Sequence, residues 1–235
     1  MTTQDHRSRV AAERRERMRM RLIESALHVF AHKGADAAVI DDVIALAEVS
    51  RGTFYNYFRT NEELLAAVVK ELGNELMNLV EAVVRERTDP ADRLASAVRM
   101  VLHTTQAHPL LAQFVARAGM ALTAHNSLAM HYLPRDIQAG IDLGRFAMAS
   151  VELGLVLVLG SSHAAICAMT LGRDLPDQYP EEITFHMLLG LGMTRAQARK
   201  LVNAPIQAVS FPEDALLTRT RHPSHAHSPR HTPSA

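Results

Sequence analysis

The sequence predicts an all-α fold. Apolar residues recur every three or four positions along most of the chain, which is the period of an amphipathic helix. No run alternates β-branched with polar residues as a surface strand would, and the prolines lie largely in turns and in the C-terminal tail. With 235 residues, 48% of them hydrophobic, the chain suits one moderate domain or two smaller ones that share a core.

Two amphipathic helices are expected before a tight turn near the N-terminus. The apolar stripes consist of Ile23, Ala26, Leu27 and Phe30 in the first helix, and of Ile40, Val43, Ile44 and Ala47 in the second. Gly34 is placed to end the first helix, because glycine adopts the left-handed conformation that follows a helix terminus.

A third short helix is expected to begin after Ser50, whose side chain is a good N-cap. Val49 can pack against Phe54 as a hydrophobic staple, and Phe54 and Phe58 bury one face. The opposite face carries Arg51, Gly52, Thr53, Asn56 and Tyr57. An inward apolar face and an outward arginine, hydroxyl and amide are typical of a helix-turn-helix that reads DNA, although any αα-corner could share the pattern.

A long fourth helix follows, with Thr60 and Glu63 spaced as a capping box at its start. This order of helices, with LIESALHVFAHKG, then VSRGTFYNYF, then TNEELLAAV, resembles the N-terminal domain of the TetR (tetracycline-repressor-like) family of bacterial regulators over about residues 16–70. The resemblance implies a three-helix DNA-binding domain in residues 16–62 and a larger helical ligand-binding and dimerisation domain in residues 63–210. It also implies a homodimer that binds double-stranded DNA and a small-molecule ligand.

The outward residues of the third helix have distinct expected roles on DNA. Arg51 can donate two hydrogen bonds to guanine, Asn56 can pair with an adenine edge, and the methyl group of Thr53 can contact thymine. Gly52 belongs to the same face. The residues expected to position the helix on the sugar–phosphate backbone of the DNA are Tyr55, Tyr57 and Arg59. A two-fold dimer predicts a near-palindromic operator.

Several positions depart from the family pattern. Val39 stands where the family usually has a capping threonine, Glu48 replaces the turn glycine, and Asn61 replaces a lysine that touches the DNA backbone. Asp41 and Asp42 suit the helix dipole but would repel a nearby phosphate. We expect weaker phosphate anchoring here, and loss of DNA binding by this domain remains an alternative.

Both chain ends have unusual composition. Residues 1–15 are expected to form a flexible basic arm, within a run of arginines at positions 7, 9, 14, 15, 17, 19 and 21. Such an arm can neutralise phosphates, or it can be a solvated, helix-prone terminus. Residues 211–235, rich in histidine and proline, are expected to be disordered. Their histidines could bind a transition metal, but free histidines are the favoured interpretation.

The apolar segment Phe146–Gly172 is nearly long enough to span a bilayer. Glu152 and His163 interrupt it, and Gly160 and Ala164 would let another helix approach closely. We favour a buried helix over a membrane segment. The resemblance implies that this segment, with Glu181–Leu191, forms a four-helix dimer interface.

Side chains of mixed character on the middle helices are the candidates for a ligand pocket: His103, Gln106, Phe114, Arg117, Met120, His125 and Tyr132. A buried Arg117 would indicate an anionic ligand, whereas a solvated or salt-bridged one would not. The phosphate-binding glycine loop, the nucleophile elbow and HExxH are all absent from the sequence, so no enzyme, cofactor or metal site is expected.

A single Cys167 excludes an internal disulfide, and no signal peptide is recognised, so we expect a cytoplasmic protein. The net charge is formally zero, so only the local distribution of charge bears on DNA binding. The sequence therefore predicts a homodimeric, ligand-responsive transcriptional regulator, most simply a repressor. The alternative is an architectural or partner-controlled DNA-binding protein without a small-molecule inducer.

Overall fold

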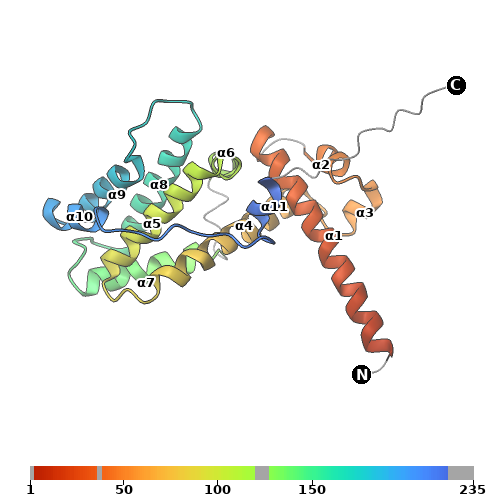
Figure 1. Ribbon diagram of the computed structural model, residues 1–235, viewed down its shortest axis with the longest axis horizontal. Helices are drawn as coiled ribbons and strands as arrows, with labels where there is room; N and C mark the ends of the chain where they lie inside the picture. The colour runs from red at the N-terminus through yellow and green to blue at the C-terminus, as the bar shows by residue number, and fades with distance from the viewer. Residues whose placement is uncertain (1–2, 36–38, 120–126, 222–235) are drawn as a thin grey trace.

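The computed structural model describes residues 3–35, 39–119 and 127–221, and these ranges contain helices and no strand (Figure 1). The all-α prediction is confirmed. The helices are α1 (Thr3–Lys33), α2 (Ile40–Leu46), α3 (Arg51–Tyr55), α4 (Asn61–Val84), α5 (Pro90–Ala107), α6 (Pro109–Ala118), α7 (Ala129–Asp142), α8 (Val151–Met169), α9 (Tyr179–Gly190), α10 (Arg195–Val202) and α11 (Leu216–Arg221).

The molecule is elongated, with α1, α2 and α3 at one end and α5 with α7 to α10 at the other (Figure 1). The long helix α4 runs from the first group into the second. The N-terminal half of α1 projects away from the rest of the chain (Figure 1). We call α1 to α3 with the start of α4 the head, and the remaining helices the body.

Two hydrophobic clusters form the core. The body cluster joins α5 to α10, with Phe185 and Leu188 of α9 fully enclosed. The head cluster is built on Phe30, Phe54 and Leu64, but it also takes in Phe114 of α6 and Leu216 and Leu217 at the start of α11. The head core is therefore completed by side chains that come from far along the sequence.

The helix ends expected from the sequence are present. Gly34 has φ +92°, so it ends α1 in the left-handed region where glycine is favoured. The Ser50 hydroxyl accepts from the Thr53 amide at 3.0 Å. The Thr60 hydroxyl likewise accepts from the Glu63 amide at 3.1 Å, but the Glu63 carboxylate accepts from the amide of Arg59, so the capping box is only half formed.

The expected flexible arm over residues 1–15 is not found where the structure describes it. Residues 3–15 continue α1 as regular helix. Ala11 and Ala12 favour the helix, and Arg9 pairs with Glu13 one turn away at 3.7 Å. The buried part of α1 already forms the helix nucleus, so each residue added toward the N-terminus requires only helix propagation, which is less unfavourable than nucleation.

The expected disorder over residues 211–235 is also corrected in its first part. Leu216 and Leu217 are buried in the head core, and α11, to which they belong, contacts α1 and α4. Ala215, just before α11, is buried as well. The Glu75 carboxylate accepts the Leu216 amide at 3.0 and 3.1 Å. Burial raises the pKa of Glu75, against the opposing effect of the backbone amides. Residues 222–235 lie outside the described residues.

The helix α8 is long and apolar enough to cross a bilayer by length and composition alone. Only 22% of its most apolar window is buried within this chain. Leu153 and Val156 are 54% and 72% exposed, and Gly160 and Ala164 continue the exposed line along the helix. The burial expected for this helix is therefore not supplied by the single chain.

Candidate DNA-binding surface

The turn between α2 and α3 is shaped by a residue other than glycine. Glu48 has φ +50°, the left-handed value that its replacement of glycine led us to expect. It is the one described residue with a side chain that has a positive φ. Val49 packs against the head core that contains Phe54, which places the start of α3 against the protein interior.

The face of α3 that the sequence assigned to DNA is turned outward. The exposed residues on this face and just beyond α3 are Arg51, Gly52, Tyr55, Asn56 and Arg59, and the half-buried ones are Thr53 and Tyr57. A Cβ built at Gly52 would meet only the Ser50 hydroxyl, at 3.8 Å. The Thr53 hydroxyl lies 2.8 Å from that of Ser50, which fixes its side chain at the helix start.

Three acidic residues around the turn between α2 and α3 are paired with basic neighbours. Arg51 donates to the Asp41 carboxylate at 2.5 Å, and both side chains are well exposed, at 63% and 73%. Lys33 pairs with Asp42 at 2.7 Å, and Arg21 pairs with Glu48 at 3.4 Å. In the free protein, therefore, Arg51 is held by a carboxylate that a guanine base would have to displace.

The other two departures from the family pattern point inward. Val39 is fully buried, and α2 starts without a side-chain cap. The Asn61 amide donates to the carbonyl of Ala35 at 2.9 Å, so it ties down the chain between α1 and α2. The expectation of weaker phosphate anchoring at these positions stays a prediction.

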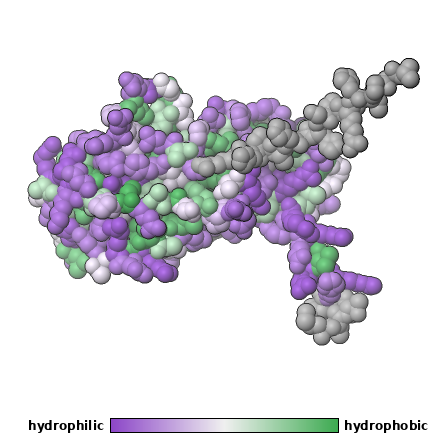
Figure 2. Space-filling model, viewed as in Figure 1, coloured by the Kyte–Doolittle hydropathy of each residue, from purple (hydrophilic) through white to green (hydrophobic). Residues whose placement is uncertain are grey.

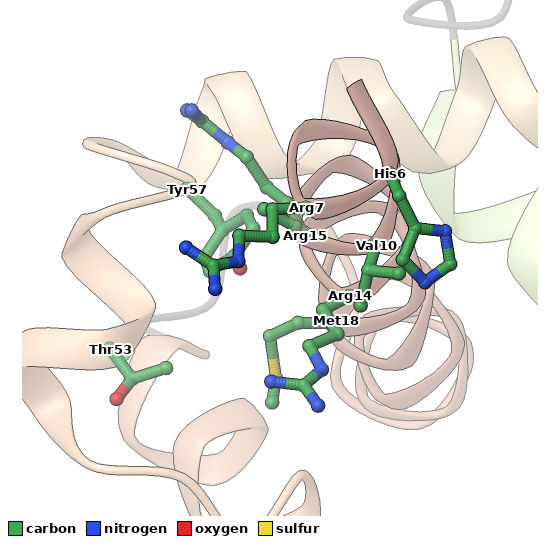
Figure 3. A pocket seen from close by; sticks show the side chains of 9 residues that line it. His6, Arg7, Val10, Arg14, Arg15, Met18, Thr53 and Tyr57 are labelled. Atoms are coloured by element: carbon green, nitrogen blue, oxygen red, sulfur yellow. The ribbon is translucent and has the colours of Figure 1, made fainter. Parts of the chain in front are cut away.

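A cleft of about 780 Å³ separates the N-terminal half of α1 from α3. Its walls include Arg7, Arg14 and Arg15 on α1, and Thr53 and Tyr57 on the other side. Figure 3 shows the three arginines on the side of α1 that faces Thr53 and Tyr57. The projecting part of α1 is largely hydrophilic on the face seen in Figure 2. The sequence indicated a basic terminus here, but not a cleft.

The candidate ligand residues do not come together. Phe114 is fully buried in the head core, while Gln106 and Arg117 are exposed, and Arg117 donates to the backbone carbonyl of His32. Tyr132 is half-buried under the guanidinium of Arg135, at 5.1 Å from its ring centroid. Met120 and His125 lie outside the described residues.

His103 is the candidate that lines a cavity in the body. This cavity of about 400 Å³ lies between α5 and the segment after α10, and its lining residues are Met100, His103, Thr104, Ala107, His108 and residues 206–209. His103 contacts Glu181 at 2.8 Å, and the buried Arg99 donates to the same carboxylate at 3.2 Å. Burial alone would raise the pKa of Glu181, but the hydrogen bond from His103 leads the effects that hold it below its usual value.

A second polar cluster, not anticipated from the sequence, joins three helices of the body. Glu81 of α4 accepts from Arg93 of α5 at 3.4 Å and from Arg135 of α7 at 3.1 Å, and Asp136 of α7 lies 3.2 Å from Arg93. Burial raises the pKa of Asp136, against the opposing effect of Arg135. These ion pairs hold the end of α4 that lies in the body against α5 and α7.

The fold and the exposed face of α3 define a helix-turn-helix DNA-binding protein. Residues 22–68 match the family model of bacterial regulatory proteins of the tetR family, and residues 89–204 match the model of the tetracyclin repressor-like C-terminal domain. The chain belongs to the TetR family of transcriptional regulators. The first matched region covers most of the head, and the second lies within the body.

Named relatives are regulators of the same type. The repressor DhaR of Mycobacterium sp. (strain GP1) is 28% identical over 37% of this chain and 44% of its own length. The activator FasR of Mycolicibacterium smegmatis is 28% identical over 61% of this chain and 70% of its own. The first of these matches therefore spans less than half of the relative.

The structure also resembles that of RolR in complex with resorcinol. The TM-score is 0.69 and the sequence identity is 28%, and the match covers 85% of this chain and all of RolR. A stearoyl-CoA complex of the regulator FadR from Bacillus subtilis, at 17% identity and a TM-score of 0.56, shares the fold. The expectation of a TetR-type fold is confirmed by these comparisons.

Proposed function

We propose that the chain is a homodimeric repressor that binds a near-palindromic operator in the cytoplasm and is released by a small-molecule ligand. The observation that carries this proposal is the outward face of α3, where Arg51, Thr53 and Asn56 lie free of the core on a capped helix. These side chains supply the donors and the methyl group that read base edges in a major groove.

Base reading is tested by Arg51→Ala and Thr53→Ala in a mobility-shift assay on the DNA upstream of the gene. Each substitution should cost roughly 1–3 kcal/mol on the preferred site and relax the preference at one base pair. Asn203→Ala, at the far end of the body, is the matched control and should bind as wild type. Unchanged operator binding by the double variant would exclude α3 as the recognition helix.

The exposed apolar line on α8 supports the dimer, because a partner helix would cover Leu153 and Val156. Gly160 offers a sharp test, since a Cβ there meets no atom within 4 Å inside the chain. Gly160→Arg should therefore fold normally. It should sediment as a monomer and, for the same reason, lose its operator affinity. A monomer that keeps specific affinity would refute the dimer.

The cavity beside His103 supports a compact ligand, because 400 Å³ lies within the range of small-molecule sites. The similarity to RolR, whose structure holds resorcinol, makes small phenols the first compounds to try. A phenol should release the protein from its operator, and His103→Ala should weaken the response while leaving DNA affinity intact. Failure of all ligands to release it would favour the alternative of a partner-controlled DNA-binding protein.

A further inference from the structure

We propose that the N-terminal half of α1 and the recognition helix α3 act together as a rigid two-sided clamp on one DNA strand, whose sugar–phosphate backbone lies in the cleft between them. This inference rests on the proposed function of α3. It assigns to residues 6–18 a docking role for duplex DNA that the helix-turn-helix alone does not have.

The first support is the charge on the α1 wall. Arg7, Arg14 and Arg15 line the cleft, and none of the three is paired with a carboxylate among the described residues. Three of the four other arginines on α1 are paired with carboxylates: Arg9 with Glu13 at 3.7 Å, Arg19 with Glu71 at 2.9 Å and Arg21 with Glu48 at 3.4 Å. The fourth, Arg17, lies outside the cleft. Three of the four arginines of α1 without a carboxylate partner among the described residues therefore line the cleft that faces α3, which is the arrangement that an anionic strand requires.

The second support is the spacing of these arginines. Arg7 and Arg14 are seven residues apart, which is almost two full turns, so they lie on one face roughly 10 Å apart along the helix. Arg15 lies next to Arg14 on the side toward Tyr57 (Figure 3). Guanidinium groups at this separation engage different phosphates rather than competing for one.

The third support is the rigidity of the wall. The helix continues without a break into the part of α1 where Leu22, Ile23 and Ala26 are fully buried in the head core. Because the same core holds Phe54 of α3, the position of the arginines relative to the recognition helix is set by one packed unit. A clamp of this kind fixes where the backbone lies, in addition to attracting it.

The opposite wall has a suitable surface for a strand. Tyr57 offers a hydroxyl and Thr53 a half-buried side chain, and both belong to the helix-turn-helix. A strand held in the cleft would border the major groove that α3 enters. The clamp is thus continuous with the proposed base-reading face.

The test measures the salt dependence of duplex binding by the full chain with single charge-removing variants. Each phosphate contact contributes a slope of about 0.9, so Arg14→Gln should lower the slope by about two per dimer. Arg9→Gln removes the same charge from the same helix outside the cleft, and should change the slope by less than half a unit. Equal slopes for the two variants would overturn the clamp.

A second variant separates a rigid clamp from simple attraction. Ala12→Pro keeps every charge but breaks the helix between Arg7 and Arg14, because proline removes a hydrogen bond and clashes with the preceding turn. It should lower the slope about as much as Arg7→Gln does, and circular dichroism should show only a small loss of helix. A wild-type slope in Ala12→Pro would mean that a flexible arm suffices, which contradicts the proposal.

These outcomes are distinct from failure of the proposed function. Phosphate contacts do not depend on sequence, so the slopes are measured on a random duplex as well as on the operator. Equal affinity of the wild-type chain for both duplexes would refute operator recognition. The difference in salt-dependence slope between Arg14→Gln and Arg9→Gln would still decide whether the cleft holds the DNA backbone.

Discussion

The ion pair between Asp41 and Arg51 leads to a prediction about DNA affinity. Asp41→Asn removes a carboxylate that repels phosphate and frees Arg51 for a base. A carboxylate about 7 Å from a phosphate is repelled by about 0.6 kcal/mol in water, and an exposed ion pair contributes roughly 0.2–1 kcal/mol. The gain is about 1 kcal/mol per subunit, or about 2 kcal/mol for two heads, which is roughly a 30-fold tighter complex.

The control for this variant is Asp42→Asn, which removes the same charge at the adjacent residue but frees Lys33 rather than Arg51. Fluorescence anisotropy at two salt concentrations gives both affinities. Asp42→Asn should show only the repulsion part of the gain, and the loss of either exposed pair should change the free energy of unfolding by less than about 1 kcal/mol. An equal gain in the two variants would refute the idea that Asp41 restrains Arg51.

Two further predictions concern stability. Phe114→Ala should lower the free energy of unfolding by about 3–5 kcal/mol in a denaturant titration, because the ring of Phe114 is fully enclosed in the head core. A loss of less than about 1 kcal/mol would contradict this role in the core. Burial raises the pKa of Glu75 in the folded state, so its carboxyl binds a proton more readily there than in the unfolded chain, and its contribution to stability should increase as the pH falls through the folded-state pKa. Glu75→Gln should remove that part of the pH dependence of Tm, and an unchanged pH profile would count against it.

The sequence was sufficient for the local features of the head. Gly34, Ser50 and Thr60 end or begin helices where their chemistry predicts, and the positive φ of Glu48 follows from its place in the turn. These features depend on neighbours within four residues. They can therefore be predicted from the sequence without knowledge of the tertiary contacts.

The features that were missed depend on distant contacts. Leu216 joins the head core through Glu75, 141 residues earlier, and no local pattern predicts that pairing. Phe114 shares an apolar stripe with its helix neighbours, but the sequence does not say which core the stripe enters. Likewise the segment over residues 3–15 is polar and rich in arginine, which the sequence alone reads as a flexible arm, and its helical continuity comes from the packed part of α1.

The shared core of head and body has a consequence for how the chain melts. A fragment that ends at residue 62 would leave Phe30 and Phe54 without the side chains of α4, α6 and α11 that enclose them. We expect such a fragment to be largely unfolded, and the whole chain to lose both parts in a single cooperative transition. Grafting this head onto another body would accordingly require α6 and α11 to be carried with it.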